Sequence, residues 1–261
     1  MDDTTRALVL EIARSHALDY YLAALLSPRA HRDDLFVLAA FEGEMERIPG
    51  DVSEPMVAEI RLQWWRDWIA AFAPGSASGN PVADAFADVV LRHRLDRDRL
   101  ISSIDARSSL DDAPLQLLFP GTPNELLARD AAAMQRAAQV LGVYPTGDHE
   151  SGLRSAGLAL SFARRALATR AHLGRATGLV LSLKGDLQQA RHNLMHVKAQ
   201  ISAWPRPLRL AALPVALVEP YLRACEGVRK PDDAGKAPHY GGILPLTRVW
   251  RLWGLARLGQ L

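Results

Sequence analysis

Cysteine and long apolar runs are scarce in this sequence, and each scarcity excludes a class of protein. Cys225 is the single cysteine among 261 residues, so the chain can form neither an internal disulfide nor a multi-cysteine zinc or iron–sulfur site. The longest apolar run, Leu210 to Val218, contains Pro214 and is far shorter than the ~20 residues of a membrane-spanning helix. The first residues also lack the basic start and apolar run of a secretory signal. We therefore expect a soluble protein of a reducing compartment, with peripheral membrane contact still open.

Charge is unevenly distributed along the chain. Residues 1–150 hold 14 basic and 24 acidic side chains, whereas residues 151–261 hold 17 and 5, although the net charge is only +2. Of the 31 basic residues only four are lysines, and arginine suits pairing with carboxylate or phosphate, although a GC-rich genome also favours it. The two halves either neutralise each other within one fold or leave a basic face for an anionic partner, such as lipid headgroups or an acidic protein.

Apolar residues recur at helical spacing almost throughout the chain, and strand patterns are nearly absent. The sequence therefore predicts an all-α protein with one domain over residues 1–261 and a loop near 227–242 before the last helix. Turn residues such as Ser27-Pro28 and Pro49-Gly50 separate the helices. The predicted helices span 4–26, 31–48, 53–72, 80–93, 96–107, 123–141, 150–173, 183–203, 207–226 and 243–258.

Three stretches of the chain share the pattern of one known family. The first runs from Asp19 to Pro28 and is followed by Leu35 to Phe41; the third opens with Gly-Leu-Ala at Gly157. The second and most specific joins Val-Ser-Glu-Pro at 52–55 to Glu-Ile-Arg-Leu-Gln-Trp-Trp-Arg at 59–66. Together they resemble the squalene and phytoene synthase family. The resemblance covers nearly the whole chain and implies an isoprenoid-synthase-type helical bundle around a central cavity.

The resemblance also implies two aspartate-rich motifs that face each other across the cavity. Their carboxylates hold Mg²⁺, which in turn binds the diphosphate of a prenyl substrate and helps it leave. In this chain the run aligned with the first motif, residues 46–50, has one carboxylate, an arginine and a proline. In the second motif Arg164 stands in place of an asparagine, and Ala168 and His172 in place of aspartates. We therefore expect no catalytic residue, metal site or cofactor.

A branch of the family shares this loss of aspartates. The Arg-x-Gln-Trp-Trp signature and Leu-Pro-Leu at 244–246 resemble the assembly factors of respiratory complex I. This resemblance implies a non-catalytic assembly or partner-binding factor for a membrane complex, in the cytoplasm or peripherally on the inner membrane. The alternatives are an Mg²⁺-dependent transferase that joins two prenyl diphosphates, and a peripheral protein that binds an isoprenoid or another lipid. Nucleic acid is not expected as a partner, because no aromatic residues interleave the basic half as in known modules.

Several side chains could line the cavity or bind a ligand. Glu42 and Glu46 share a helix face, and we favour solvated carboxylates over a retained metal site, because ionised carboxylates are rarely buried without a partner. Arg61 and Gln63 lie in an otherwise apolar helix, which indicates buried hydrogen bonds to another helix or to a ligand headgroup. The candidate residues are Tyr20, Tyr21, Glu42, Glu46, Arg61, Gln63, Trp64, Arg164, Arg165 and His172.

Two further patterns have competing interpretations. His192 and His196 have the spacing of two zinc ligands on a helix, but the sequence places no third ligand, so we favour an ordinary polar face. Residues 246–258 combine tryptophans and aliphatic residues with three arginines and no acid. This composition suits a helix in the headgroup region of an anionic membrane. The alternative is a helix that closes the bundle with its tryptophans in the core.

Overall fold

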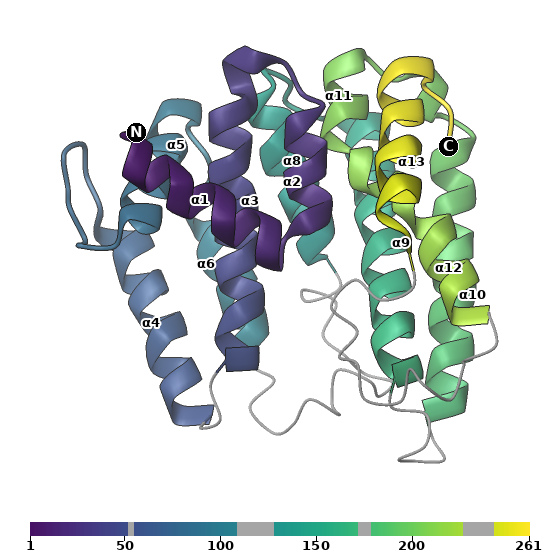
Figure 1. Cartoon of the computed structure of the whole chain (residues 1–261), viewed down its shortest axis with the longest axis horizontal. Coiled ribbons are helices and arrows are strands. Elements are labelled where there is room, and N and C mark those ends of the chain that lie inside the picture. Colours follow the sequence, from purple (N-terminus) through teal and green to yellow (C-terminus); the bar gives the residue numbers. More distant parts are fainter. Residues whose placement is uncertain (52–54, 109–127, 172–178, 227–242) are drawn as a thin grey trace.

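The computed structural model describes residues 1–51, 55–108, 128–171, 179–226 and 243–261, and within these ranges it contains helices and no strand. The all-α prediction is therefore confirmed. Helices α1 to α6 form one side of the molecule and α9 to α13 the other, with α8 behind α2 (Figure 1). The α-helices are α1 (Asp3–His16), α2 (Leu18–Leu25), α3 (Arg29–Asp51), α4 (Pro55–Ala71), α5 (Pro81–His93), α6 (Arg97–Ser108), α8 (Arg129–Val140), α9 (Gly147–Ala171), α10 (Leu179–Lys198), α11 (Arg206–Ala211), α12 (Val218–Glu226) and α13 (Pro245–Leu258).

Helix α9 is the central element of the group formed by α9 to α13. It packs against α10 and α12, and also against α8. It approaches α8 closely at Gly157, where an added Cβ atom would lie 2.1 Å from the backbone nitrogen of Ala131. On the other side, α3 contributes Phe41 to an aromatic core with Trp65 of α4 and Phe86 of α5, and the Phe41 and Phe86 rings stack with centroids 4.1 Å apart. Helix α8 also packs on α3, so it connects the two groups.

The predicted single helix over 4–26 is wrong, because the chain bends between α1 and α2. Ala17 adopts φ −138° and ψ 46°, outside the helical region. The apolar periodicity continues across this bend and therefore carries no sign of it. The bend places the side chain of Asp19 in the first turn of α2, where it is fully buried.

The predicted helix over 207–226 is also interrupted. Residues Leu213–Leu217 form a 3-10 helix between α11 and α12. Pro214 lies within it and has no N–H for a helical hydrogen bond, which favours the tighter turn. At the other boundaries the differences are small, although α3 continues through Pro49 to Asp51 where we expected a turn. The predicted loop at 227–242 and the first residues of the predicted helix 123–141 lie outside the described residues.

Candidate functional site

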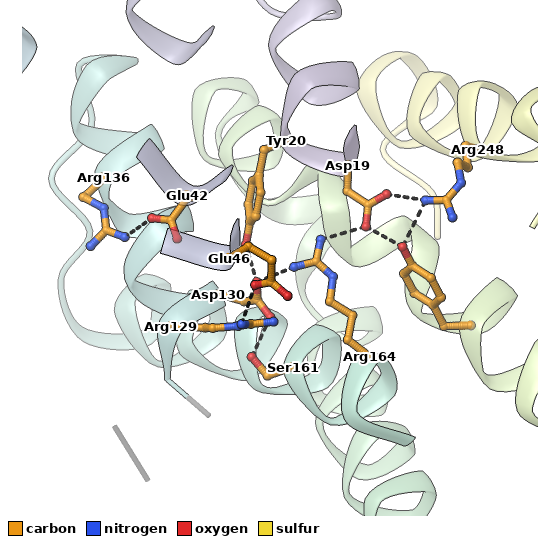
Figure 2. A network of polar contacts seen from close by, with 11 residues as sticks. Asp19, Tyr20, Glu42, Glu46, Arg129, Asp130, Arg136, Ser161, Arg164 and Arg248 are labelled. Carbon is orange, nitrogen blue, oxygen red and sulfur yellow. Dashed lines mark hydrogen bonds and ion pairs between the residues drawn. The ribbon is translucent and has the colours of Figure 1, made fainter. Parts of the chain in front are cut away.

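A buried polar network joins α2, α9, α12 and α13, with Asp19 at its centre (Figure 2). The carboxylate of Asp19 accepts hydrogen bonds from Arg164 Nη2 at 2.7 Å and from the hydroxyl of Tyr221 at 2.6 Å, and it also pairs with Arg248. Arg248 Nη1 donates to the Tyr221 hydroxyl at 3.0 Å. Asp19 and Arg248 are both almost completely excluded from solvent. A charge at this depth is tolerated only with a partner, and two arginines supply it here.

Arg164 connects Asp19 to a second buried carboxylate, Asp130 on α8. Its Nη1 atom donates to Asp130 Oδ1 at 2.7 Å. Tyr20 donates to the same oxygen at 2.5 Å, and Ser161 donates to Oδ2 at 2.6 Å. Arg164 therefore bridges two carboxylates from helices far apart in sequence, and both oxygens of Asp130 have donors.

The contacts around Asp130 shift the pKa of Asp130, Arg164 and Tyr20. Burial by itself would raise the pKa of Asp130, but Arg164 and Arg129 outweigh burial and hold this pKa below its ordinary value. Burial lowers the pKa of Arg164, but Asp130 and Asp19 raise it more, so the net shift is well upward. Burial and the charge of Asp130 raise the pKa of Tyr20 well above its usual value. At neutral pH Asp130 and Arg164 are therefore charged, and Tyr20 is a neutral donor.

The lowered pKa of Asp130 predicts an acid-dependent contribution to stability. Because the folded pKa lies below the unfolded value of ~3.9, the stabilisation is complete above that pH and is lost as the pH falls through the folded pKa. Asp130→Asn cannot titrate at this position. We expect its deficit in the free energy of unfolding, measured by urea titration, to be largest near neutral pH and to shrink below about pH 4. A deficit that is independent of pH would contradict this assignment.

Glu42 and Glu46 also have arginine partners, both from α8 (Figure 2). Glu46 is half-exposed and pairs with Arg129 at 2.7 Å. Glu42 is buried and pairs with the buried Arg136, so the prediction of a solvated carboxylate is wrong for Glu42. The physical reason is that α8 supplies a guanidinium that the sequence around Glu42 does not show. A cavity of about 30 Å³ lies beside this pair, which is room for about one water molecule.

Two other candidates, Tyr21 and Arg165, have their contacts outside this network. Tyr21 stacks on Phe36 with ring centroids 5.3 Å apart. Arg165 pairs with the buried Asp186 of α10, and not with the carboxylates around Arg164. His172 lies outside the described residues.

In the signature helix α4, Arg61 and Gln63 point outward, so their predicted burial is wrong. Both side chains are exposed, and Gln63 Nε2 donates to Asp67 Oδ1 at 2.7 Å within the same helix. The buried stripe of α4 is Leu62, Trp65 and Ile69, and residues 61 and 63 lie to either side of it.

Of the three tryptophans in α4, two contribute to packing. Trp65 is buried against Phe41 and Phe86, and Trp68 is partly buried and donates to the carbonyl oxygen of Ala83 at 3.2 Å. Trp64 stacks on Trp68 but remains exposed, so it forms part of the outer surface of α4.

Exposure of Arg61 predicts that its removal hardly changes stability. We expect Arg61→Ala to alter the free energy of unfolding by less than about 0.5 kcal/mol in chemical denaturation. The matched control is Arg66→Ala in the same helix, because Arg66 is largely buried and pairs with Glu59 and Asp105. We expect the control to lose about 1–3 kcal/mol. An Arg61→Ala loss as large as that of Arg66→Ala would restore the buried-anchor interpretation.

The side chains present do not suit the magnesium ions that the family resemblance implies. The described ranges contain no group of three or more acidic, histidine or cysteine residues placed to hold a metal. In the network and its neighbouring pairs, four carboxylates meet four guanidinium groups, so the cluster is formally neutral. Mg²⁺ requires oxygen ligands that keep their negative charge available, and here arginines already neutralise them. His192 and His196 are exposed and contact each other at 3.2 Å, which also fits a polar helix face.

Comparison with known proteins decides the family. Residues 13–185 match the model of the squalene/phytoene synthase family. The chain belongs to this family. It is also similar to NADH dehydrogenase (ubiquinone) complex I, assembly factor 6, with 34% identity to the Bos taurus protein and 32% to the Homo sapiens protein, each over 104 residues. These matches cover 40% of the present chain and 31% of each relative, so the chain spans about a third of the length of the curated relatives.

Within this squalene/phytoene synthase family member, the network includes residues that the sequence reasoning did not select. Asp130, Ser161, Tyr221 and Arg248 were not among the candidates, and Asp19 was noted only as part of a resembling stretch. One signal was present in the sequence, since Asp19 interrupts an otherwise apolar segment. Such an acid, next to a tyrosine and followed by alanine and leucine, is a reason to look for a buried partner.

Proposed function

We propose that this protein is a non-catalytic member of the squalene/phytoene synthase family that assists the assembly of a respiratory NADH dehydrogenase of the complex I type. The observation that carries this proposal is the position of Arg164. It replaces the asparagine of the second metal motif and bridges Asp19 and Asp130. The similarity to complex I assembly factor 6 supports the assembly role and a component of that complex as the protein partner.

The charges around Arg164 argue against the alternative, a prenyl transferase. Such an enzyme needs carboxylates from both sides of the cavity to hold Mg²⁺ against a diphosphate. On α9, the sequence from Gly157 to Ala171 contains no acid, and its two adjacent arginines are engaged by Asp19, Asp130 and Asp186. The site therefore has the internal charge balance of a structural core.

The assembly role is tested by deleting the gene in its native host and measuring assembled NADH dehydrogenase on native gels. We expect the complex to be depleted in the deletion strain and restored by the wild-type gene. Glu46→Gln should restore it equally, because Glu46 aligns with a metal-binding aspartate but here only forms a half-exposed ion pair. Unchanged complex in the deletion strain would overturn the proposal. Failure of a folded Glu46→Gln protein would favour a catalytic or metal-dependent function.

A further inference from the structure

Helix α13 has a buried face that closes the bundle. Arg248, Leu252, Leu255 and Ala256 are buried, and Arg248 reaches the central carboxylate of Asp19. The helix packs on the 3-10 helix 213–217, α11 and α2. Its inner face therefore belongs to the core. This agrees with the alternative interpretation of residues 246–258 as a helix that closes the bundle.

The opposite face of α13 is unexpectedly apolar. At 100° per residue, Leu246, Trp250, Trp253 and Arg257 form a single row on the side of the helix away from the buried face. Trp250 is 70% exposed and Leu246 is 83% exposed, and Trp250 stacks on Trp253 with centroids 5.6 Å apart. The alternative of a bundle-closing helix is therefore wrong where it places the tryptophans in the core. We call Leu246, Trp250, Trp253 and Arg257 the outer row.

The charge around the outer row is positive. Neither α13 nor the adjacent α11 contains an acid, and α11 contributes Arg206 and Arg209. Glu219 of α12 pairs with Arg251 of α13. It also pairs with Lys198 and Arg223. Its charge is therefore more than balanced by neighbouring cations.

We propose that the outer row of α13 binds the surface of an anionic lipid bilayer, with Trp250 and Trp253 in the headgroup region. Tryptophan favours this region because its ring is apolar and its N–H can still reach water. The neighbouring arginines add electrostatic attraction to anionic headgroups. None of the helices in the described ranges is long and apolar enough to cross a membrane. This inference does not depend on the assembly role, because purified protein and vesicles suffice to observe it.

A second exposed apolar row distinguishes this proposal from a general effect of surface hydrophobicity. On α4, Met56, Ile60 and Trp64 are exposed one turn apart. Unlike α13, α4 also carries the acids Glu59 and Asp67 beside its arginines. An anionic bilayer should therefore select α13 over α4, and Ile60, which is 62% exposed, provides a matched control position.

The test is sedimentation of the full-length protein with vesicles of phosphatidylcholine, alone or mixed with phosphatidylglycerol, at low and high salt. We expect binding to the mixed vesicles to be about tenfold or more stronger at low salt and to weaken as salt is added. The double variant Trp250→Glu/Trp253→Glu should lose at least about tenfold of this binding, since it removes both interfacial rings and adds two acids. Arg257→Gln should lose roughly fivefold at low salt. Ile60→Glu should bind like the wild type, and circular dichroism melts should show that all variants are folded.

Several results would overturn the proposal. Wild-type protein that ignores the mixed vesicles at low salt excludes it, as does equal loss of binding in Ile60→Glu. If the wild type instead forms a concentration-dependent dimer that Trp250→Glu dissociates, the outer row is an interface between copies of this chain. Equal binding to neutral and mixed vesicles would contradict the role of the arginines.

Discussion

Replacement of Arg248 by methionine is expected to lower the free energy of unfolding by about 3–5 kcal/mol. Methionine retains much of the apolar volume but leaves the fully buried Asp19 with Arg164 and the Tyr221 hydroxyl as its remaining donors. Asp19 then has one guanidinium partner in place of two, so more of the free-energy cost of burying its charge is left uncompensated. Urea unfolding followed by circular dichroism measures the change.

The matched control for this variant is Arg251→Met, one turn further along α13. Arg251 is partly exposed and lies 3.3 Å from the partly exposed Glu219, so solvent screens this pair. We expect the control to lose less than about 1 kcal/mol. Similar losses in the two variants would show that Arg248 stabilises α13 only as a surface residue would, and would remove the buried network from the account.

Gly157→Ala is the second substitution with a large expected effect. The added methyl group would lie 2.1 Å from the backbone nitrogen and 2.2 Å from the Cα atom of Ala131, so α8 and α9 would have to separate. Backbone atoms cannot rotate away as a side chain can, and we expect a loss of about 3 kcal/mol in the free energy of unfolding. The same movement would disturb Asp130 and Ser161, which face each other across this contact.

Gly185→Ala on α10 makes the same chemical change in a helix interior without the contact. Apart from the adjacent residues and the nearby backbone of α10, no described atom lies within 4 Å of the added Cβ position, so the higher helix propensity of alanine should stabilise the protein by about 0.5–1 kcal/mol. The two variants are therefore expected to shift the thermal midpoint in opposite directions. A mild effect of Gly157→Ala would mean that α8 and α9 are less tightly packed than the contact with Ala131 indicates.

Much of the fold could be predicted from the sequence, because apolar periodicity and turn residues are local properties. The bend at Ala17 could not be, since the apolar pattern continues across it and the reason for the bend is tertiary. It lets Asp19 reach Arg164 and Arg248, which are more than 140 residues away in the sequence. The 3-10 segment at Pro214 had a local signal, the proline itself, that the apolar pattern outweighed.

The candidate site was harder to predict because it consists of ion pairs between residues far apart in the sequence. The sequence around Glu42 shows no cation to pair with a buried carboxylate, and only the fold shows that Arg136 of α8 reaches it. Arg61 and Gln63 were expected inside because their helix is rich in apolar residues, yet the buried stripe passes between them. Pairing across the fold also explains part of the uneven charge along the chain. Asp19 from the acidic half pairs with Arg164 and Arg248 from the basic half.

We propose that an arginine-centred network has replaced the metal-dependent site of the synthases. It is tested most directly by incubating the purified full-length protein with farnesyl or geranylgeranyl diphosphate and Mg²⁺, and analysing extracted products by mass spectrometry. An active synthase of the family, assayed in parallel, serves as the positive control. We expect no squalene, presqualene diphosphate or phytoene above the protein-free blank, because Arg164 and its partners leave no carboxylate cluster for Mg²⁺ in the described site. Protein-dependent formation of any of these products would contradict it.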